Sequence, residues 1–426
     1  MKIHFHGAAR EVGRAGCLVE EDKKRVMIDY GVKISSEQNI NPLPVKGFLD
    51  AVIVTHSHLD HSGAVPMLYH NSEQPCFMTP PSTPMIDLLV KDSIKINDLK
   101  GLIPIFTERH VKRMMRNVKQ VSYNDEKKIG NFSFKFQDAG HILGAGTVEM
   151  QTKKHKLVYT GDLKSEDTRL HKKAYDNFKG VDVLVVESTY GDREHPERKQ
   201  LEKDFVEACW EVCDNNGNVL VPAFAVGRTQ EIISILNAHG FEYPIFMDGM
   251  GKAAAEIMME YPEYLNNYNE FYKAMKECTW VNSSHERKKA VEDPSVVVST
   301  AGMLSGGPAI SYLFKMKEKE KNQAIFFSGY QVTDTPGFRL MKEKRLKYEG
   351  FDLDFKKFDI RHFDFSAHSD KHGLLDFVKK LSPKICLVQH GEEEQALAFG
   401  QKIEEELGIT TIVPKFGQKV NIEDYI

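Results

Sequence analysis

The segment VIVTHSHLDHSG, residues 52–63, carries the strongest structural and chemical signal in this chain. Its β-branched start predicts a buried strand over residues 51–55. Four polar side chains follow within six positions: His56, His58, Asp60 and His61. Imidazole and carboxylate groups are ordinary ligands of Zn²⁺ and also suit Mn²⁺ or Fe. Three histidines and an aspartate directly after an apolar strand favour a metal site over a loop of solvated histidines.

The spacing of these side chains divides them between two ions. Residues two apart in an extended segment project to the same side, so His56 and His58 can bind one ion. Asp60 and His61 lie where a turn and a helix are expected to begin. They therefore point elsewhere and can bind a second ion.

Two later polar segments, each at the end of a predicted strand, offer further ligands. DAGHILGAG (138–146) places His141 in a glycine-flanked loop, and LVYTGDLKS (157–165) places Asp162 directly after a strand. Either residue alone is typical of a cap or a turn, but both follow strands as the first cluster does. Asp29, in RVMIDYG, also follows an apolar strand and could orient a ligand histidine.

The pattern of strands and helices changes twice along the chain. Short β-branched or alternating segments dominate up to residue 191. From 192 to 345, strands such as NVLVPAF (218–224) alternate with helical segments, which predicts α/β structure with a parallel sheet. A charged segment, MKEKRLKYEG (341–350), precedes the last part, which we place at 346–426.

The composition limits the classes of protein to which the chain can belong. The chain has 426 residues, 41% of them hydrophobic and 28% charged, which is typical of globular domains. No apolar run approaches the roughly 18–20 residues of a membrane span, and the N-terminus lacks the pattern of a signal peptide. The net charge of −4 gives no sign of a nucleic-acid partner and does not exclude one. Six scattered cysteines without a CxxC pair predict a reducing, cytoplasmic compartment, and Cys209 and Cys213 are expected to face a core.

HSHLDHSG, followed by His141 and Asp162 and preceded by Asp29, resembles the metallo-β-lactamase superfamily. The resemblance covers residues 1–190 and implies an αββα sandwich with a two-metal site at one edge of its sheets. It implies these ligands: His56, His58 and His141 for the first metal, Asp60 and His61 for the second, and Asp162 as the bridging carboxylate.

Three further motifs extend the resemblance to the whole chain. VVESTYGDREH contains Glu187, FSAHSD contains His368 and LVQHGE contains His390. They are similar to motifs A, B and C of the β-CASP nucleases, in which an α/β domain is inserted into the lactamase fold. The resemblance implies that His390 completes the second metal's ligands, and that His368, Glu187 and Asp60 are catalytic. Taken singly, each motif residue could be a cap or a satisfied strand-end side chain.

HSHLDHSG and VPAFAVGRTQE resemble the archaeal homologues of the cleavage-and-polyadenylation (CPSF) endonuclease, of the type that lacks KH domains. Two segments resemble the RNA-processing members in general. They are VPAFAVGRTQE (221–231) and STAGMLSGGP (299–308). Helix N-termini and glycine-rich backbone can bind phosphate. We therefore expect Arg228, Ser305 and Gly306 near the RNA backbone, with ordinary strand-to-helix turns as the alternative.

The resemblance implies a ribonuclease with two Zn²⁺ ions per chain, with Mn²⁺ as the other candidate. It implies endonucleolytic cleavage, with 5′→3′ exonuclease action as a second mode, leaving 5′-phosphate and 3′-hydroxyl ends in RNA 3′-end processing or decay. It also implies a homodimer, to which the last residues, VPKFGQKVNIEDYI, could contribute an edge strand, and a link to RNA-processing or transcription machinery. The alternatives are an inactive scaffold subunit, a small-ester or thioester hydrolase, and a DNA nuclease, which His390 disfavours.

Overall fold

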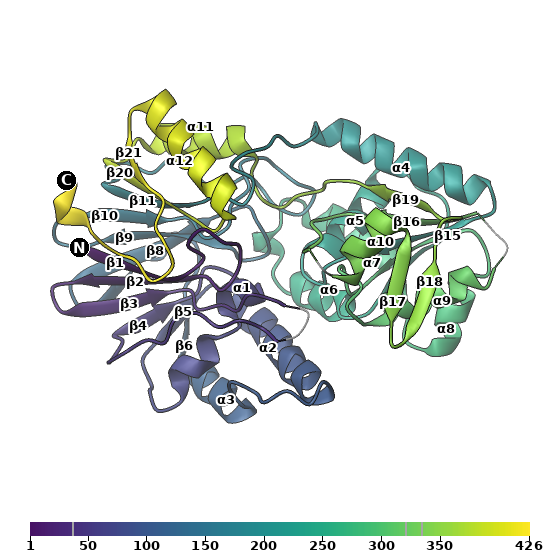
Figure 1. Cartoon of the computed structure of the whole chain (residues 1–426), viewed down its shortest axis with the longest axis horizontal. Helices are drawn as coiled ribbons and strands as arrows, with labels where there is room; N and C mark the ends of the chain where they lie inside the picture. The colour runs from purple at the N-terminus through teal and green to yellow at the C-terminus, as the bar shows by residue number, and fades with distance from the viewer. Residues whose placement is uncertain (36–37, 320–321, 334) are drawn as a thin grey trace. The chain divides into compact units, whose positions relative to one another are not determined.

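The computed structural model describes residues 1–35, 38–319, 322–333 and 335–426. They form two compact units (Figure 1). Unit 1 comprises Met1–Asp167, Lys172–Glu194 and Ala367–Ile426. Unit 2 comprises Thr168–His171 and His195–Ser366.

Two sheets of seven strands face each other in unit 1. In spatial order, the first sheet contains β22 (Lys419–Asn421), β1 (Lys2–Gly7), β2 (Gly16–Glu21), β3 (Lys24–Ile28), β4 (Ala51–Ile53), β5 (Cys76–Met78) and β6 (Val118–Gln120). The second contains β21 (Thr410–Ile412), β20 (Ile385–Gln389), β11 (Val183–Glu187), β10 (Lys156–Tyr159), β9 (Gly146–Gln151), β8 (Phe132–Asp138) and β7 (Lys127–Ile129).

Alternating side chains give each sheet of unit 1 two buried faces. In β10, Leu157 and Tyr159 point into the core between the sheets, whereas Val158 points to the outer face. Helices cover both outer faces (Figure 1). They are α2 (Ser82–Leu99) and α3 (Glu108–Arg116) on the first sheet, and α11 (Lys371–Leu381) and α12 (Glu393–Leu407) on the second. The expected αββα sandwich is confirmed.

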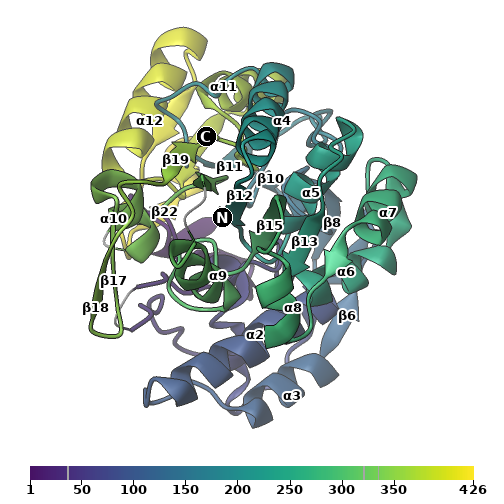
Figure 2. The ribbon, with the colours of Figure 1, turned by 90° about the vertical axis from the view of Figure 1, so that its right-hand side faces the viewer.

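Unit 2 contains a sheet of six strands, and every neighbouring pair in it is parallel. The order is β14 (Thr279–Trp280), β13 (Ile245–Asp248), β15 (Ser295–Ser299), β12 (Asn218–Pro222), β16 (Gln323–Phe327) and β19 (Asp359–His362). The helices are α4 (Arg198–Asp214), α5 (Arg228–Ala238), α6 (Gly251–Met259), α7 (Tyr268–Glu277), α8 (Ser284–Lys289), α9 (Pro308–Lys317) and α10 (Pro336–Glu343). Figure 2 shows α9 and α10 on one side of the strands and α5 and α7 on the other. Because both faces are covered, β12, β15 and β16 are buried along their whole length, and the expected parallel α/β structure is confirmed.

The second boundary between the units lies at residues 366 and 367, whereas the sequence placed it at 345 and 346. The charged segment there forms a hairpin of β17 (Arg345–Tyr348) and β18 (Phe351–Asp354). The strand after it, β19, pairs with β16 and so belongs to the sheet of unit 2.

The C-terminal segment contributes β22, which pairs antiparallel with β1 of the same chain at the edge of the first sheet. All six cysteines are buried, unbridged thiols, including Cys209 and Cys213 on α4. Within the described ranges, no helix combines the length and the apolar character needed to cross a membrane.

Candidate metal centre

The polar motifs of unit 1 meet at one edge of the sandwich because their strands run in the same direction. β10, β11 and β20 are parallel neighbours, so their carboxyl ends lie side by side. Asp162 follows β10, Glu187 ends β11, and His390 follows β20. On the first sheet, β3 and β4 are also parallel, and Asp29 and Thr55 lie just beyond their ends.

One group of ligand atoms comes from His56, His58, His141 and Asp162. The Nε2 atoms of His56 and His141 lie 3.5 and 3.6 Å from Asp162 Oδ2, and His58 Nδ1 lies 3.1 Å from His141 Nε2. Four ligands at Zn²⁺ bond lengths stand about 3.3 Å apart at the corners of a tetrahedron. The spacing therefore fits one tetrahedral ion.

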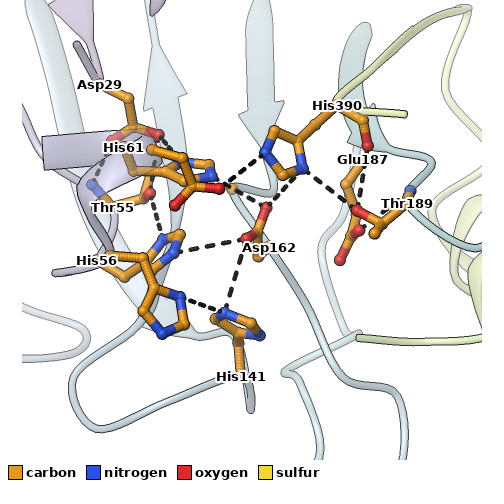
Figure 3. Close-up of polar contacts among 12 residues, drawn as sticks. Asp29, Thr55, His56, His61, His141, Asp162, Glu187, Thr189 and His390 are labelled. Atoms are coloured by element: carbon orange, nitrogen blue, oxygen red, sulfur yellow. Dashed lines mark hydrogen bonds and ion pairs between the residues drawn. The ribbon is translucent and has the colours of Figure 1, made fainter. Parts of the chain in front are cut away.

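A second group comes from Asp60, His61, Asp162 and His390. Asp162 Oδ1 lies 3.2 Å from His61 Nε2 and 3.3 Å from His390 Nδ1. Asp162 thus turns one oxygen toward each group, and Figure 3 shows the surrounding imidazoles directed at its carboxylate. The structure brings together all seven residues that the sequence analysis named as ligands.

Burial and neighbouring charges shift the pKa values of the buried ligands. Burial lowers the pKa of His56 and His141 well below the ordinary histidine value, so both are neutral at pH 7. Burial would raise the pKa of Asp162, but the neighbouring histidines, His390 first, lower it well below the aspartate range. The first group therefore presents the neutral imidazoles of His56 and His141 beside an ionised Asp162. In the second group, burial would lower the pKa of His61, but Asp162 and Asp29 raise it well above the ordinary histidine value.

Several of these atoms are buried with no hydrogen-bond partner among the described residues: His56 Nε2, His61 Nε2 and Asp162 Oδ1. Buried polar atoms without partners are rare because desolvation makes them costly. A metal ion would satisfy all three, so the donor set fits the predicted centre.

A layer of hydrogen bonds orients the ligands. Asp29 accepts from the Thr55 backbone N–H at 2.8 Å and from Thr55 Oγ1 at 2.9 Å, and its Oδ2 lies 2.8 Å from His61 Nδ1. Thr55 Oγ1 lies 3.1 Å from His56 Nδ1. Gly31 allows the Asp29 loop to approach α1 (Leu59–Ser62), because a Cβ there would lie 1.7 Å from the Asp60 carbonyl oxygen. Such contacts hold the imidazole rings in place.

The sequence analysis did not identify Thr55, Thr189 or Gly13 as members of the site. Thr189 Oγ1 lies 3.2 Å from His390 Nδ1, and the Gly13 N–H donates to His390 Nε2 at 3.3 Å. The two threonines could have been found, because each lies within two positions of a motif residue. Nothing in the local sequence marks Gly13, which reaches His390 only through the fold.

His368 and Glu187 form a pair beside the two groups. His368 Nδ1 lies 3.0 Å from both carboxylate oxygens of the fully buried Glu187. His368 Nε2 lies 3.9 Å from Asp162 Oδ2, on the side of the metal ligands. Burial would lower the pKa of His368, but the carboxylates of Glu187 and Asp162 raise it to about 9. In the metal-free protein, the His368 ring is therefore protonated on both nitrogens and positively charged at neutral pH.

The residues expected near RNA lie in unit 2, at the carboxyl edge of its parallel sheet. Arg228 opens α5 after β12, and Ser305 and Gly306 lie in the loop between β15 and α9. Because β12 and β15 are neighbours, these two loops lie side by side, and a Cβ at Gly302 would lie 3.0 Å from the Phe224 backbone nitrogen. Ser305 is exposed and Arg228 is half-buried.

Three family models match successive parts of the chain. A beta-lactamase superfamily domain matches residues 24–213, and a Beta-Casp domain matches residues 229–340. A Zn-dependent metallo-hydrolase RNA specificity domain matches residues 356–414.

Three archaeal proteins are similar to this chain over most of its length. A probable RNase, MJ4, of Methanocaldococcus jannaschii is 37% identical over 99% of this chain and 100% of its own length. RNase aCSPSF2 of Saccharolobus solfataricus is 35% identical over 98% of this chain and 84% of its own. The transcription termination factor FttA of Thermococcus kodakarensis is 32% identical over 97% of this chain and 70% of its own.

A solved structure of a protein of unknown function from Enterococcus faecalis is also similar. It has a TM-score of 0.64 and 15% identity, and the alignment covers 98% of this chain and 99% of that one. At this identity the likeness shows a shared fold.

Proposed function

The chain belongs to the β-CASP family of the metallo-β-lactamase superfamily and is a metal-dependent hydrolase of RNA, and we propose that it is a zinc-dependent endoribonuclease. The observation that carries the proposal is the carboxylate of Asp162, which turns one oxygen toward each of two groups of buried ligands. Two ions sharing one carboxylate is the arrangement that in-line hydrolysis of a phosphodiester uses.

We assign the ligands as follows: His56, His58, His141 and Asp162 for one Zn²⁺, and Asp60, His61, Asp162 and His390 for the other. Mn²⁺ is the alternative, since carboxylate and imidazole ligands suit it as well. Asp29 would orient His61. We further assign unit 1 to the lactamase domain and unit 2 to the β-CASP domain, in place of the boundaries at 191 and 345 expected from the sequence.

When bound, the ions would neutralise phosphate charge and lower the pKa of a water toward 7. The residues of the chain then have two tasks. Glu187 accepts a hydrogen bond from His368 Nδ1 and favours the charged ring. His368 would donate the proton on Nε2 to the leaving 3′ oxygen, which produces 3′-hydroxyl and 5′-phosphate ends. Asp60 would contribute to catalysis by binding the second ion.

The substrate would be held by backbone and side-chain groups of unit 2. Arg228 supplies positive charge, and the glycine-rich loop at Ser305 and Gly306 supplies backbone N–H groups. Positive charge and backbone N–H groups bind phosphate oxygens, so we propose that these groups position the RNA backbone.

Cleavage of one RNA labelled at its 5′ end tests this function. Internal cuts whose labelled upstream products end in a 3′-hydroxyl, and that disappear in His368→Ala, would support the endonuclease. Release of labelled mononucleotide alone would replace it with a 5′ exonuclease. Full metal content without cleavage of RNA, together with hydrolysis of a small ester, would contradict the RNA substrate.

We also propose a cytoplasmic homodimer that works with RNA-processing or transcription machinery. The six unbridged thiols suit a reducing compartment. β22 lies at the edge of its sheet, where the corresponding strand of a second chain could pair. Light scattering should then give twice the chain mass of 48.5 kDa, and the mass of one chain would contradict the dimer.

A further inference from the structure

A second group of metal-binding side chains lies at the other end of the unit 1 sandwich. Glu21 ends β2, His155 precedes β10, and Glu423 lies in the short helix η3 (Ile422–Asp424). One ligand atom from each lies within 4.8 Å of the others. Asp162 follows the opposite end of β10, on the order of 20 Å away, so the two sites are separate. Figure 1 shows both chain termini near β1 and β10, at this end of unit 1.

Glu21 is a buried carboxylate that lacks its usual partners. Its side chain is 5% exposed, and neither carboxylate oxygen has a hydrogen-bond partner among the described residues. A buried carboxylate without such partners is unfavourable unless a cation compensates its charge.

His155 faces the same point from the second sheet. Its Nδ1 is buried, has no hydrogen-bond partner in the described part of the chain, and lies 3.7 Å from Glu21 Oε1. That distance is too long for a hydrogen bond between the two side chains. It is close to the separation of about 3.3 Å between two ligands of one tetrahedral ion.

Glu423 supplies an accessible third ligand. Its Oε1 contacts the Met1 amino group at 3.0 Å and Lys154 Nζ at 3.4 Å, and one of its carboxylate oxygens lies within 4.8 Å of the ligand atoms of Glu21 and His155. Its side chain is 41% exposed, and it lines, together with Glu21, a surface depression of about 390 Å³. A hydrated ion can therefore reach the buried pair from solvent.

We propose that Glu21, His155 and Glu423 bind one divalent transition-metal ion, Zn²⁺ or Mn²⁺. Two carboxylates would balance its charge, and the imidazole favours a transition metal over Ca²⁺ or Mg²⁺. The ion would join β2 of the first sheet, the β9–β10 turn of the second sheet and the C-terminal segment. Its role is structural, and it does not depend on the function proposed above.

Metal content after equilibrium dialysis against buffered Zn²⁺ tests this site. The wild-type chain should hold one equivalent more than Glu21→Gln. Glu423→Gln, which changes a partly exposed side chain, should bind that equivalent at least about tenfold more weakly. Glu20→Gln is the matched control, because Glu20 lines the same depression but pairs with Arg25 and His4. It should keep the full content, and RNA cleavage by Glu21→Gln should be unchanged.

Equal metal content in the wild type, Glu21→Gln and Glu423→Gln would overturn the site and leave Glu21 and His155 as an ion pair. If circular dichroism shows that Glu21→Gln is unfolded, Glu423→Gln decides the question. The measurement compares variants with the wild type, so it gives the same answer whether the catalytic centre holds two ions or fewer.

Discussion

At the scale of single residues, the centre depends most on Asp162, because it is the one side chain shared by both ligand groups. It is 2% exposed, and histidine nitrogens surround its carboxylate within 4 Å: those of His56, His61, His141, His368 and His390. Glu187 has a comparable role for the catalytic pair, since its two oxygens both face His368 Nδ1 and its Oε1 also accepts from the Leu163 N–H. A carboxylate held at two points fixes the direction of the ring that it orients.

Removing a ligand should remove metal. We expect Asp162→Ala to lose both catalytic ions and His58→Ala to lose at least the first, because few ligands remain to hold them. Elemental analysis of the purified variants measures this loss. His70→Ala is the control, since His70 is exposed and contacts His110 away from the ligand groups. Full metal content in Asp162→Ala would contradict the assignment.

Removing the proton donor should leave the metal in place. His368→Ala is expected to keep both ions and to lose about 10²–10⁴-fold in the rate of RNA cleavage, the usual contribution of a general acid. Single-turnover cleavage and elemental analysis of the same preparation measure the two properties. His372→Ala, an exposed histidine on α11, is the control and should cleave normally. A metal-depleted His368→Ala would show that His368 has a structural role instead.

At the scale of elements, the N-terminal half of α4 is anchored by buried charge. Glu202 is 4% exposed and accepts from Arg169 Nη2 at 2.6 Å and from Arg198 Nε at 2.9 Å. His239 Nε2, at the end of α5, lies 3.1 Å from it. These contacts connect residues 168–171 with two helices of unit 2.

Glu202→Gln should therefore destabilise unit 2 by about 1.5–3 kcal/mol, the value of hydrogen bonds between charged groups. Both tryptophans, Trp210 and Trp280, belong to unit 2, so urea unfolding followed by tryptophan fluorescence reports on this unit. Glu207→Gln, at an exposed position on α4, is the control. Equal unfolding midpoints for Glu202→Gln and the wild type would refute the anchoring role.

The same variant should show a defined pH dependence. Burial would raise the pKa of Glu202, but Arg169 and Arg198 lower it below the glutamate range. A lowered pKa means that the carboxylate stabilises the fold above about pH 4.3 and that this contribution is lost as the pH falls through the lowered value. The difference in unfolding free energy between wild type and Glu202→Gln should thus shrink at acid pH.

At the scale of the whole molecule, the proposed metal ligands come from both sheets of unit 1. β4 and α1 on the first sheet provide four of them, and segments after β8, β10 and β20 on the second provide the other three. Bound ions would therefore join the two layers of the sandwich.

Chelation should then lower the thermal stability of the chain. A ligand present at 1,000 times its Kd stabilises the native state by about 4 kcal/mol, so apo protein should melt several degrees earlier. Differential scanning calorimetry of apo and Zn²⁺-refilled Glu21→Gln measures this effect without the proposed structural ion. Identical melting temperatures would contradict an ion that bridges the sheets.

Local patterns were sufficient to predict the chemistry and most elements of the fold. His56, His58, Asp60 and His61 lie within six positions, so their spacing alone indicates metal ligands. The hairpin of β17 and β18 was also within reach, because Glu349 and Gly350 form a two-residue turn with φ of 46° and 83° between alternating strands. The many charged residues of that segment made its alternating strand pattern hard to recognise.

Only the tertiary structure brought His390, Thr189 and Gly13 into contact and placed β19 in the sheet of unit 2. These contacts join positions up to 377 residues apart. Residue type and spacing specify local conformation and available chemistry, because both depend on neighbours along the chain. Contacts between distant side chains depend on the order and direction of the strands. The packing of the complete sheets determines that order and direction.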